Sequence, residues 1–230
     1  MRPAAERGRT HLDWLDSRHT FSFGDYVDPP PHGIRPAARH QRRPRGADGG
    51  FGTHGRDMEM LSWILEGEPQ HRDSLGTGSV IRPGEVQIMS AGTGIQHSEF
   101  NPSPLEPVHF LQIWIVPERR DLPPRYDQQV VSLDAGTLRQ IAGPRPGEGA
   151  VRVFQDVSVH VARLDGDQRV ECRLAAGRAA WVQVARGAVT LDGTPLHEGD
   201  GAAVTEQDRI AIAGAAPAEV IVFDLDARTV

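Results

Sequence analysis

The feature that most constrains the fold is the stretch from residue 51 to residue 101, where short apolar runs alternate with turns. The runs 58–65 and 80–89 are each about as long as a strand. A Glu-Gly turn follows the first run, and a Pro-Gly pair interrupts the second. Apolar runs of this length, bounded by Gly and Pro, are typical of strands. The stretch therefore predicts a sheet that folds back on itself.

Two polar side chains near the end of this stretch, His97 and Glu99, are two residues apart. On a strand they would point to the same face. The folded sheet could also bring His54, near the start of the stretch, beside them. Two His and one carboxylate with open positions form the usual arrangement of non-haem Fe(II) sites. Each His alone could be an ordinary polar residue at a strand end, but the His-x-Glu pair favours a metal site.

A wider resemblance supports this interpretation. The segment GIQHSEFN, residues 94–101, fits the second cupin motif, Gly-x-x-His-x-x-x-Asn. Most of residues 1–120 resembles the pirin family, bicupin proteins of bacteria and eukaryotes, and a weaker resemblance continues to the end. Bacterial pirins are associated with quercetin 2,3-dioxygenase activity, and eukaryotic ones with transcriptional cofactor roles. The segments that carry the resemblance are WLDSRHTFSFGDYVDP (14–29), FGTH (51–54), RDMEMLSWILEGEPQHRDS (56–74), PGEVQIMSAGTGIQHSEFNPS (83–103) and LQIWIVPE (111–118).

The resemblance implies one Fe(II) per chain in the N-terminal half, which pirins hold with three His and one Glu. Other divalent metals accept the same N and O ligands. His54, His97 and Glu99 match family ligands, and Glu99 would also accept a proton from the flavonol hydroxyl. This chain reads THGRDME where the family reads THPHRDME, so the family's second His has no counterpart. Because neither Gly55 nor Arg56 normally ligates iron, we expect a site that lacks one protein ligand.

The second half of the chain repeats the pattern of the first. From about residue 127, short alternating runs are separated by Asp-Gly and Glu-Gly turns. The turn at 196–200 resembles the Pro-Gly turn of the first half. The predicted fold class is therefore all-β, with two cupin (double-stranded β-helix, jelly-roll) barrels packed face to face.

The polar, proline-rich segment 117–126 resembles an interdomain linker. It predicts an N-terminal domain at 1–120 that holds the metal and a C-terminal domain at 121–230. His160 and His197 stand apart from other candidate ligands. We therefore expect no metal in the second domain.

Composition limits the remaining function classes. The formal net charge is −6, so no global basic field attracts nucleic acid. The single cysteine, Cys172, rules out an internal disulfide. The first residues lack the apolar core of a secretion signal, and no apolar run is long enough to span a membrane. We expect a soluble, cytoplasmic monomer whose partners are a small aromatic flavonol and O2, with no nucleic acid and no membrane.

Two other polar residues lie close to the predicted ligand segments. His71 lies among charged residues in a turn region, so we expect it to face solvent. Gln112 lies on an alternating run, 109–116. It could line the cavity beside the metal, or it could simply accompany the core packing of Trp114.

The segment HGIRPAARHQRRPRG, residues 32–46, is rich in Arg and has no periodicity. It could be a basic surface loop, or a patch that binds phosphate or nucleic acid. A third interpretation explains more. With permitted codons, the same bases read one position later give MGFGPLRVINDDRVA, which contains a strand where pirins have one. We hypothesise that residues 32 to about 48 are translated out of frame, and resequencing the coding region tests this.

The altered segment should weaken the fold, because each buried aliphatic side chain that is lost contributes roughly 1.5–3 kcal/mol. An exposed strand edge should also follow. The function expected from the resemblance is a metal-dependent dioxygenase of the quercetin 2,3-dioxygenase type, impaired by the missing His and by segment 32–48. The alternatives are a non-catalytic, iron-binding regulatory or interaction protein of the same family and a defective gene product.

Overall fold

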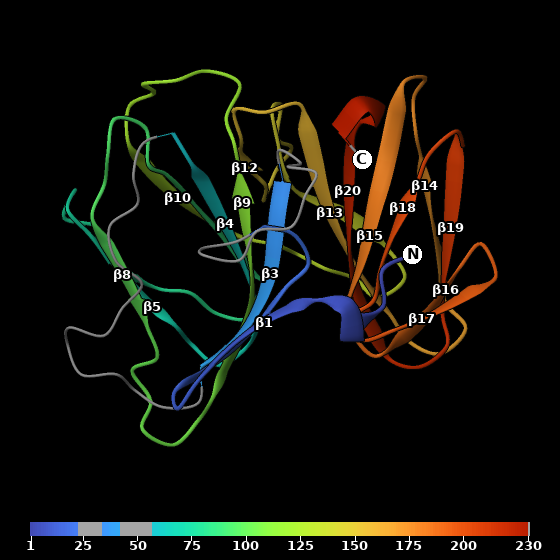
Figure 1. Cartoon of the computed structure of the whole chain (residues 1–230), viewed down its shortest axis with the longest axis horizontal. Coiled ribbons are helices and arrows are strands. Elements are labelled where there is room, and N and C mark those ends of the chain that lie inside the picture. Colours follow the sequence, from blue (N-terminus) through green and yellow to red (C-terminus); the bar gives the residue numbers. More distant parts are fainter. Residues whose placement is uncertain (23–33, 42–56, 230) are drawn as a thin grey trace. The chain divides into compact units, whose positions relative to one another are not determined.

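The structure is a computed structural model that describes residues 1–22, 34–41 and 57–229, with the backbone alone for 34–41. Strands dominate these ranges (Figure 1). Their helical segments are two short 3-10 helices, η1 (Ala4–Glu6) and η2 (Ala227–Thr229). Neither is long and apolar enough to cross a membrane, and the described ranges contain no other helix. The predicted all-β fold class is confirmed.

The chain divides into two compact units. The N-terminal unit consists of Gly8–Val131 and Val153–Gln155, and the C-terminal unit consists of Met1–Arg7, Ser132–Arg152 and Asp156–Val230. Thus each unit contains a short segment from the other half of the sequence. The main division lies after Val131, beyond the boundary expected near residue 120, because part of the expected linker forms a strand of the first unit.

The larger sheet of the N-terminal unit has seven strands in the order β1-β2-β3-β9-β4-β7-β10. Their bounds are β1 (Gly8–Leu12), β2 (Leu15–His19), β3 (Ile34–Gln41), β4 (Glu59–Glu66), β7 (Glu85–Ser90), β9 (Val108–Ile115) and β10 (Arg125–Val130). All neighbouring pairs are antiparallel. The adjacent strands β4 and β9 are buried along almost their whole length, which explains their nearly continuous apolar sequence.

The smaller sheet of this unit carries the predicted ligands. Its strands are β5 (Gln70–Asp73), β6 (Gly78–Val80) and β8 (His97–Phe100), in the order β6-β5-β8. β5 and β8 lie side by side and run antiparallel (Figure 1). The Pro-Gly pair that interrupts the run 80–89 separates β6 from β7, so the chain changes sheets at this turn.

β3 occupies the segment that we expected to be damaged. Its backbone pairs with β2 on one side and with β9 on the other. The expectation of an exposed strand edge is therefore wrong. Pro36 lies one residue beyond Ala37, the last residue that pairs with β2, and is paired with Ile113 of β9.

The C-terminal unit contains two further sheets. The six-stranded sheet has the order β12-β11-β13-β20-β15-β18, with β11 (Leu138–Gly143), β12 (Val151–Arg152), β13 (Val157–Leu164), β15 (Arg178–Arg186), β18 (Gly201–Val204) and β20 (Ala218–Asp226). The four-stranded sheet has the order β14-β19-β16-β17, with β14 (Arg169–Arg173), β16 (Ala188–Leu191), β17 (Thr194–His197) and β19 (Arg209–Gly214). Aliphatic side chains from both sheets, such as Val182, Val220 and Ile210, form one core.

Candidate metal centre

β8 presents two of the three predicted ligands on one face. His97 and Glu99 are buried, with 6% and 4% of their surfaces exposed, whereas Ser98 and Phe100 are less buried. This alternation is what a strand imposes on residues i and i+2. The structure therefore places a ring nitrogen donor and a carboxylate donor on the same face of one strand.

Gln112 holds the carboxylate of Glu99 in place. From the neighbouring sheet, where it lies on β9, its Nε2 donates a hydrogen bond to Oε2 of Glu99 at 2.6 Å. Gln112 is only 1% exposed, so water does not compete strongly for this bond. Of the two interpretations of Gln112, the structure favours a polar role beside the predicted ligands.

His71 does not face solvent, so that expectation was wrong. The residue is fully buried, at 0% exposure. The register of β5 and β8 pairs His71 with Glu99 and Asp73 with His97. Directly paired residues of an antiparallel sheet share a face. The sequence signal was the His-x-Asp spacing at 71–73, which matches the His-x-Glu spacing of β8.

Polar contacts fix the ring of His71. Its Nε2 lies 3.0 Å from Oδ2 of Asp73, and Nε2 of Gln87 lies 3.4 Å from its Nδ1. The ring also stacks on two others, with centroid distances of 5.7 Å to His97 and 4.7 Å to Tyr126. Such separations are typical of interacting aromatic pairs. These contacts come from β5, β7, β8 and β10, so both sheets of the unit contribute.

The Asp73 carboxylate joins His71 to a turn. Its Oδ1 accepts hydrogen bonds from the backbone N–H groups of Leu75 and Thr77, at 2.9 and 3.0 Å. Burial alone raises the pKa of Asp73, but the hydrogen bonds from His71, Thr77 and Leu75 outweigh burial and lower the pKa overall. Asp73 is therefore a stable anion that anchors both the turn after β5 and the His71 ring.

Tyr126, whose ring stacks on His71, is itself held through its hydroxyl group. Its hydroxyl contacts Ser79 and donates to Oε1 of Gln128 at 2.7 Å. Burial, with a further contribution from the carboxylates of Glu99 and Asp73, raises the pKa of Tyr126 to about 12. The phenol is therefore neutral at physiological pH and does not act as a charged group here.

An apolar surface continues from the polar residues. Ser62 pairs with Gln112 in the register, and the next pair on the same face is Met60 with Trp114. Met60 and Trp114 pack in one cluster with Met89. The polar donors thus adjoin a buried cluster of sulfur-containing and aromatic side chains.

The third predicted ligand, His54, lies outside the described residues. Within residues 1–22 and 57–229, no group of three or more His, Cys, Asp or Glu side chains could hold a metal ion. His71 does not complete such a group, because both of its ring nitrogens are engaged. The imidazole of His97 and the carboxylate of Glu99 fit a divalent metal such as Fe(II) or Ni(II) in donor type, and a further ligand must come from elsewhere.

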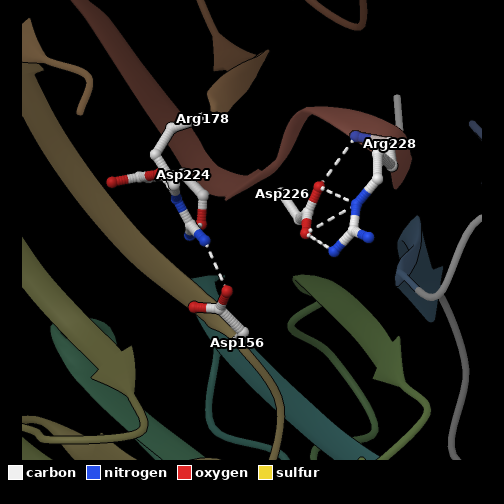
Figure 2. Close-up of polar contacts among 5 residues, drawn as sticks. All are labelled: Asp156, Arg178, Asp224, Asp226 and Arg228. Atoms are coloured by element: carbon white, nitrogen blue, oxygen red, sulfur yellow. Dashed lines mark hydrogen bonds and ion pairs between the residues drawn. The ribbon is translucent and has the colours of Figure 1, made fainter. Parts of the chain in front are cut away.

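The C-terminal unit has a polar cavity of a different kind. A cavity of about 400 Å³ is lined by Arg145, Asp156, Ser158, Arg178 and Asp224, among others. Arg178 donates hydrogen bonds to Oδ1 of Asp224 and to Oδ2 of Asp156, both at 2.7 Å. Figure 2 shows the contact between Arg178 and Asp156. Ion pairs therefore dominate this site.

The two His residues of the second half lie on separate strands. His160 lies on β13 of the six-stranded sheet, where burial lowers its pKa. His197 lies on β17 of the four-stranded sheet, with 74% of its side chain exposed.

Comparison with known proteins agrees with the sequence resemblance over the whole chain. Residues 2–115 match the Pirin family model, and residues 140–225 match the model of the quercetinase C-terminal cupin domain. The quercetin 2,3-dioxygenase of Escherichia coli (strain K12) is 41% identical, over 98% of this chain and 97% of that protein. A putative quercetin 2,3-dioxygenase of Mycobacterium tuberculosis is 39% identical, over 99% of this chain and 95% of its own length.

A solved structure extends the similarity to three dimensions. The bacterial pirin YhhW of Escherichia coli, solved in complex with nickel(II), superposes with a TM-score of 0.88 at 39% identity. The match covers 98% of this chain and 97% of YhhW. The predicted resemblance is confirmed, and so is the predicted cupin fold: this chain belongs to the pirin family.

Proposed function

We propose that this chain is a metal-dependent dioxygenase of the quercetin 2,3-dioxygenase type, which acts on flavonols such as quercetin with O2. The observation that carries the proposal is the pairing of buried His97 and Glu99 on one face of β8, with Gln112 bonded to Glu99. The relatives named quercetin 2,3-dioxygenase support the same activity. The metal, which we propose to be Fe(II), would be held by His54, His97 and Glu99.

The residues around the site would perform two tasks beside a bound metal. A bound metal would supply Lewis-acid polarisation of the flavonol oxygens and redox capacity toward O2. Gln112 donates a hydrogen bond to Oε2 of Glu99 and so orients the carboxylate, which would accept the proton of the flavonol hydroxyl. The buried apolar cluster at Met60, Met89 and Trp114 would exclude water from this side of the site. We further propose that the protein acts as a monomer in the cytoplasm, independently of nucleic acid and membranes.

The missing family His lowers the expected activity. Three protein ligands can hold Fe(II), but a site with one ligand fewer should bind the metal more weakly than a complete site. We therefore expect this chain to turn over quercetin more slowly than a variant in which Gly55 is replaced by Pro-His.

The test is to purify the chain and this restored variant, measure the metal content of each, and follow quercetin loss together with O2 consumption. Turnover that depends on added Fe(II) supports the proposal. Glu99→Gln should abolish it, whereas the exposed Glu106→Gln should leave it unchanged. Stoichiometric iron without turnover in either version would instead favour the non-catalytic, regulatory alternative.

A further inference from the structure

His71 connects the two predicted ligands of β8 to the rest of the N-terminal unit. The register pairs it with Glu99, and its ring stacks on His97. On β10, Tyr126 stacks on the same imidazole with a centroid distance of 4.7 Å. The position of the His97 ring is therefore coupled, through His71, to a strand of the other sheet.

The ring of His71 has little freedom to turn. Asp73 engages its Nε2 and Gln87 engages its Nδ1, and the residue is fully buried. The Asp73 side chain is itself fully buried and is held by two backbone N–H groups. Because neither nitrogen of His71 has a lone pair to spare, the residue supports the site without ligating a metal.

We propose that His71 is a positioning residue for the metal centre: its stacked ring fixes the imidazole plane of His97, and Asp73 and Gln87 fix His71. The proposal rests on the proposed function, since it takes His97 as a ligand. The family's second His is missing from this chain, so fewer ligands define the geometry of the metal site. The orientation of His97 by His71 should therefore matter more here than in a complete site. Removing a group that orients a ligating His typically weakens metal binding by about 10–100-fold.

The test titrates metal-free protein with Ni²⁺ and with Co²⁺, and records stoichiometry, Kd and the visible spectrum of the Co²⁺ form. We expect His71→Gln to keep the stoichiometry, to raise Kd by about 10–100-fold and to shift the Co²⁺ spectrum. His71→Phe keeps a ring for stacking and should recover most of the affinity. His197→Gln is the matched control, because His197 is exposed and lies in the other unit, and it should behave as wild type.

A folded His71→Gln protein with wild-type Kd and Co²⁺ spectrum would overturn the proposal. If that variant does not fold, His71→Phe decides: retained affinity and spectrum support the stacking role, and loss of both in a folded protein contradicts it. His97→Gln separates the two proposals. If it binds Ni²⁺ as wild type does, the ligand assignment itself fails, whatever His71 does.

Discussion

Gln112 and Glu99 form a hydrogen bond of 2.6 Å between the two sheets of the N-terminal unit, and both residues are almost fully buried. A hydrogen bond to a charged group contributes about 1.5–3 kcal/mol, and a buried carboxylate left without its donor costs more than the bond alone. The bond therefore links the stability of the unit to the geometry of the predicted ligand.

Replacing Gln112 with Leu should destabilise the metal-free protein by about 2–3 kcal/mol, because Glu99 would lose its donor inside the unit. Metal affinity should fall as well, since the carboxylate would no longer be held in one orientation. Urea denaturation and Ni²⁺ titration measure the two effects. Gln207→Leu, at an exposed position, is the control and should change neither quantity. Unchanged stability of Gln112→Leu would show that the bond contributes little.

Glu59 should make the stability of the protein depend on pH. The residue is fully buried, and burial raises its pKa above the ordinary value of 4.5, despite hydrogen bonds from the Phe154 N–H, the Ser90 hydroxyl and Arg125. A carboxyl whose pKa is raised on folding contributes its full stability below the unfolded pKa and loses it as pH rises through the folded pKa.

The free energy of unfolding of wild type should therefore fall relative to that of Glu59→Gln as pH rises from about 4 through the raised pKa of Glu59. At higher pH the difference should become constant. Urea denaturation of both proteins at a series of pH values measures it. Glu106→Gln, at an exposed position, is the matched control and should show no such trend. A difference that changes in the opposite direction would contradict the assigned shift.

The sequence placed His97 and Glu99 on one face of a strand because the signal for that arrangement was local. The spacing of His97 and Glu99, combined with strand alternation, is enough to place both side chains on one face. His71 was misjudged because its burial depends on β8 and β10, which pack on it from distant parts of the sequence. A polar segment such as QHRD does not reveal that its His will be buried.

The boundary between the units was also a non-local feature. Residues 117–126 have the composition of a linker, yet Arg125 and Tyr126 begin β10 because β7 offers them a pairing edge. Likewise, Phe154 belongs to the N-terminal unit through contacts with Glu59 and Glu118. Composition cannot anticipate pairing between segments so far apart in the chain.

Gly92 should not tolerate a side chain. Its φ of +50° lies in the left-handed region, and an added Cβ would clash with the backbone carbonyl of Leu122. The strain of φ alone costs roughly 1–2 kcal/mol, and the clash adds to it. Gly92→Ala should therefore lower the melting temperature more than Gly166→Ala, where φ is +57° but the space around the Cβ is open. Equal losses in thermal unfolding would mean that Leu122 shifts without cost.

Arg39→Val should stabilise the protein. In the register, Arg39 of β3 pairs with Ser17 and Phe110, which are both 1% exposed. Val favours strands more than most residues, on a scale that spans about 1 kcal/mol. Val is also the residue that the alternative reading frame encodes at this position. Thermal unfolding of Arg39→Val should show a higher midpoint than that of wild type. Arg145→Val, at an exposed position, should leave the midpoint unchanged. A lower midpoint for Arg39→Val would count against the frame hypothesis.

Arg178 should resist even replacement by Lys. Its guanidinium bonds to Oδ1 and the backbone oxygen of Asp224 and to Oδ2 of Asp156, three directions that one ammonium group cannot reproduce (Figure 2). Arg178 is also mostly buried, with 17% of its side chain exposed. We expect Arg178→Lys to destabilise the C-terminal unit by about 1–2 kcal/mol, measured by urea denaturation.

Arg228→Lys is the matched control for this substitution. Arg228 pairs with Asp226, which lies on β20, the strand that also carries Asp224 (Figure 2). Its side chain is 88% exposed, so water and salt screen the pair. Arg228→Lys should leave the urea midpoint unchanged. If both variants lose stability equally, the number of hydrogen bonds at Arg178 does not matter. If Arg178→Lys alone is destabilised, the three-way contact of the guanidinium holds β15 to β20 at this end of the sheet.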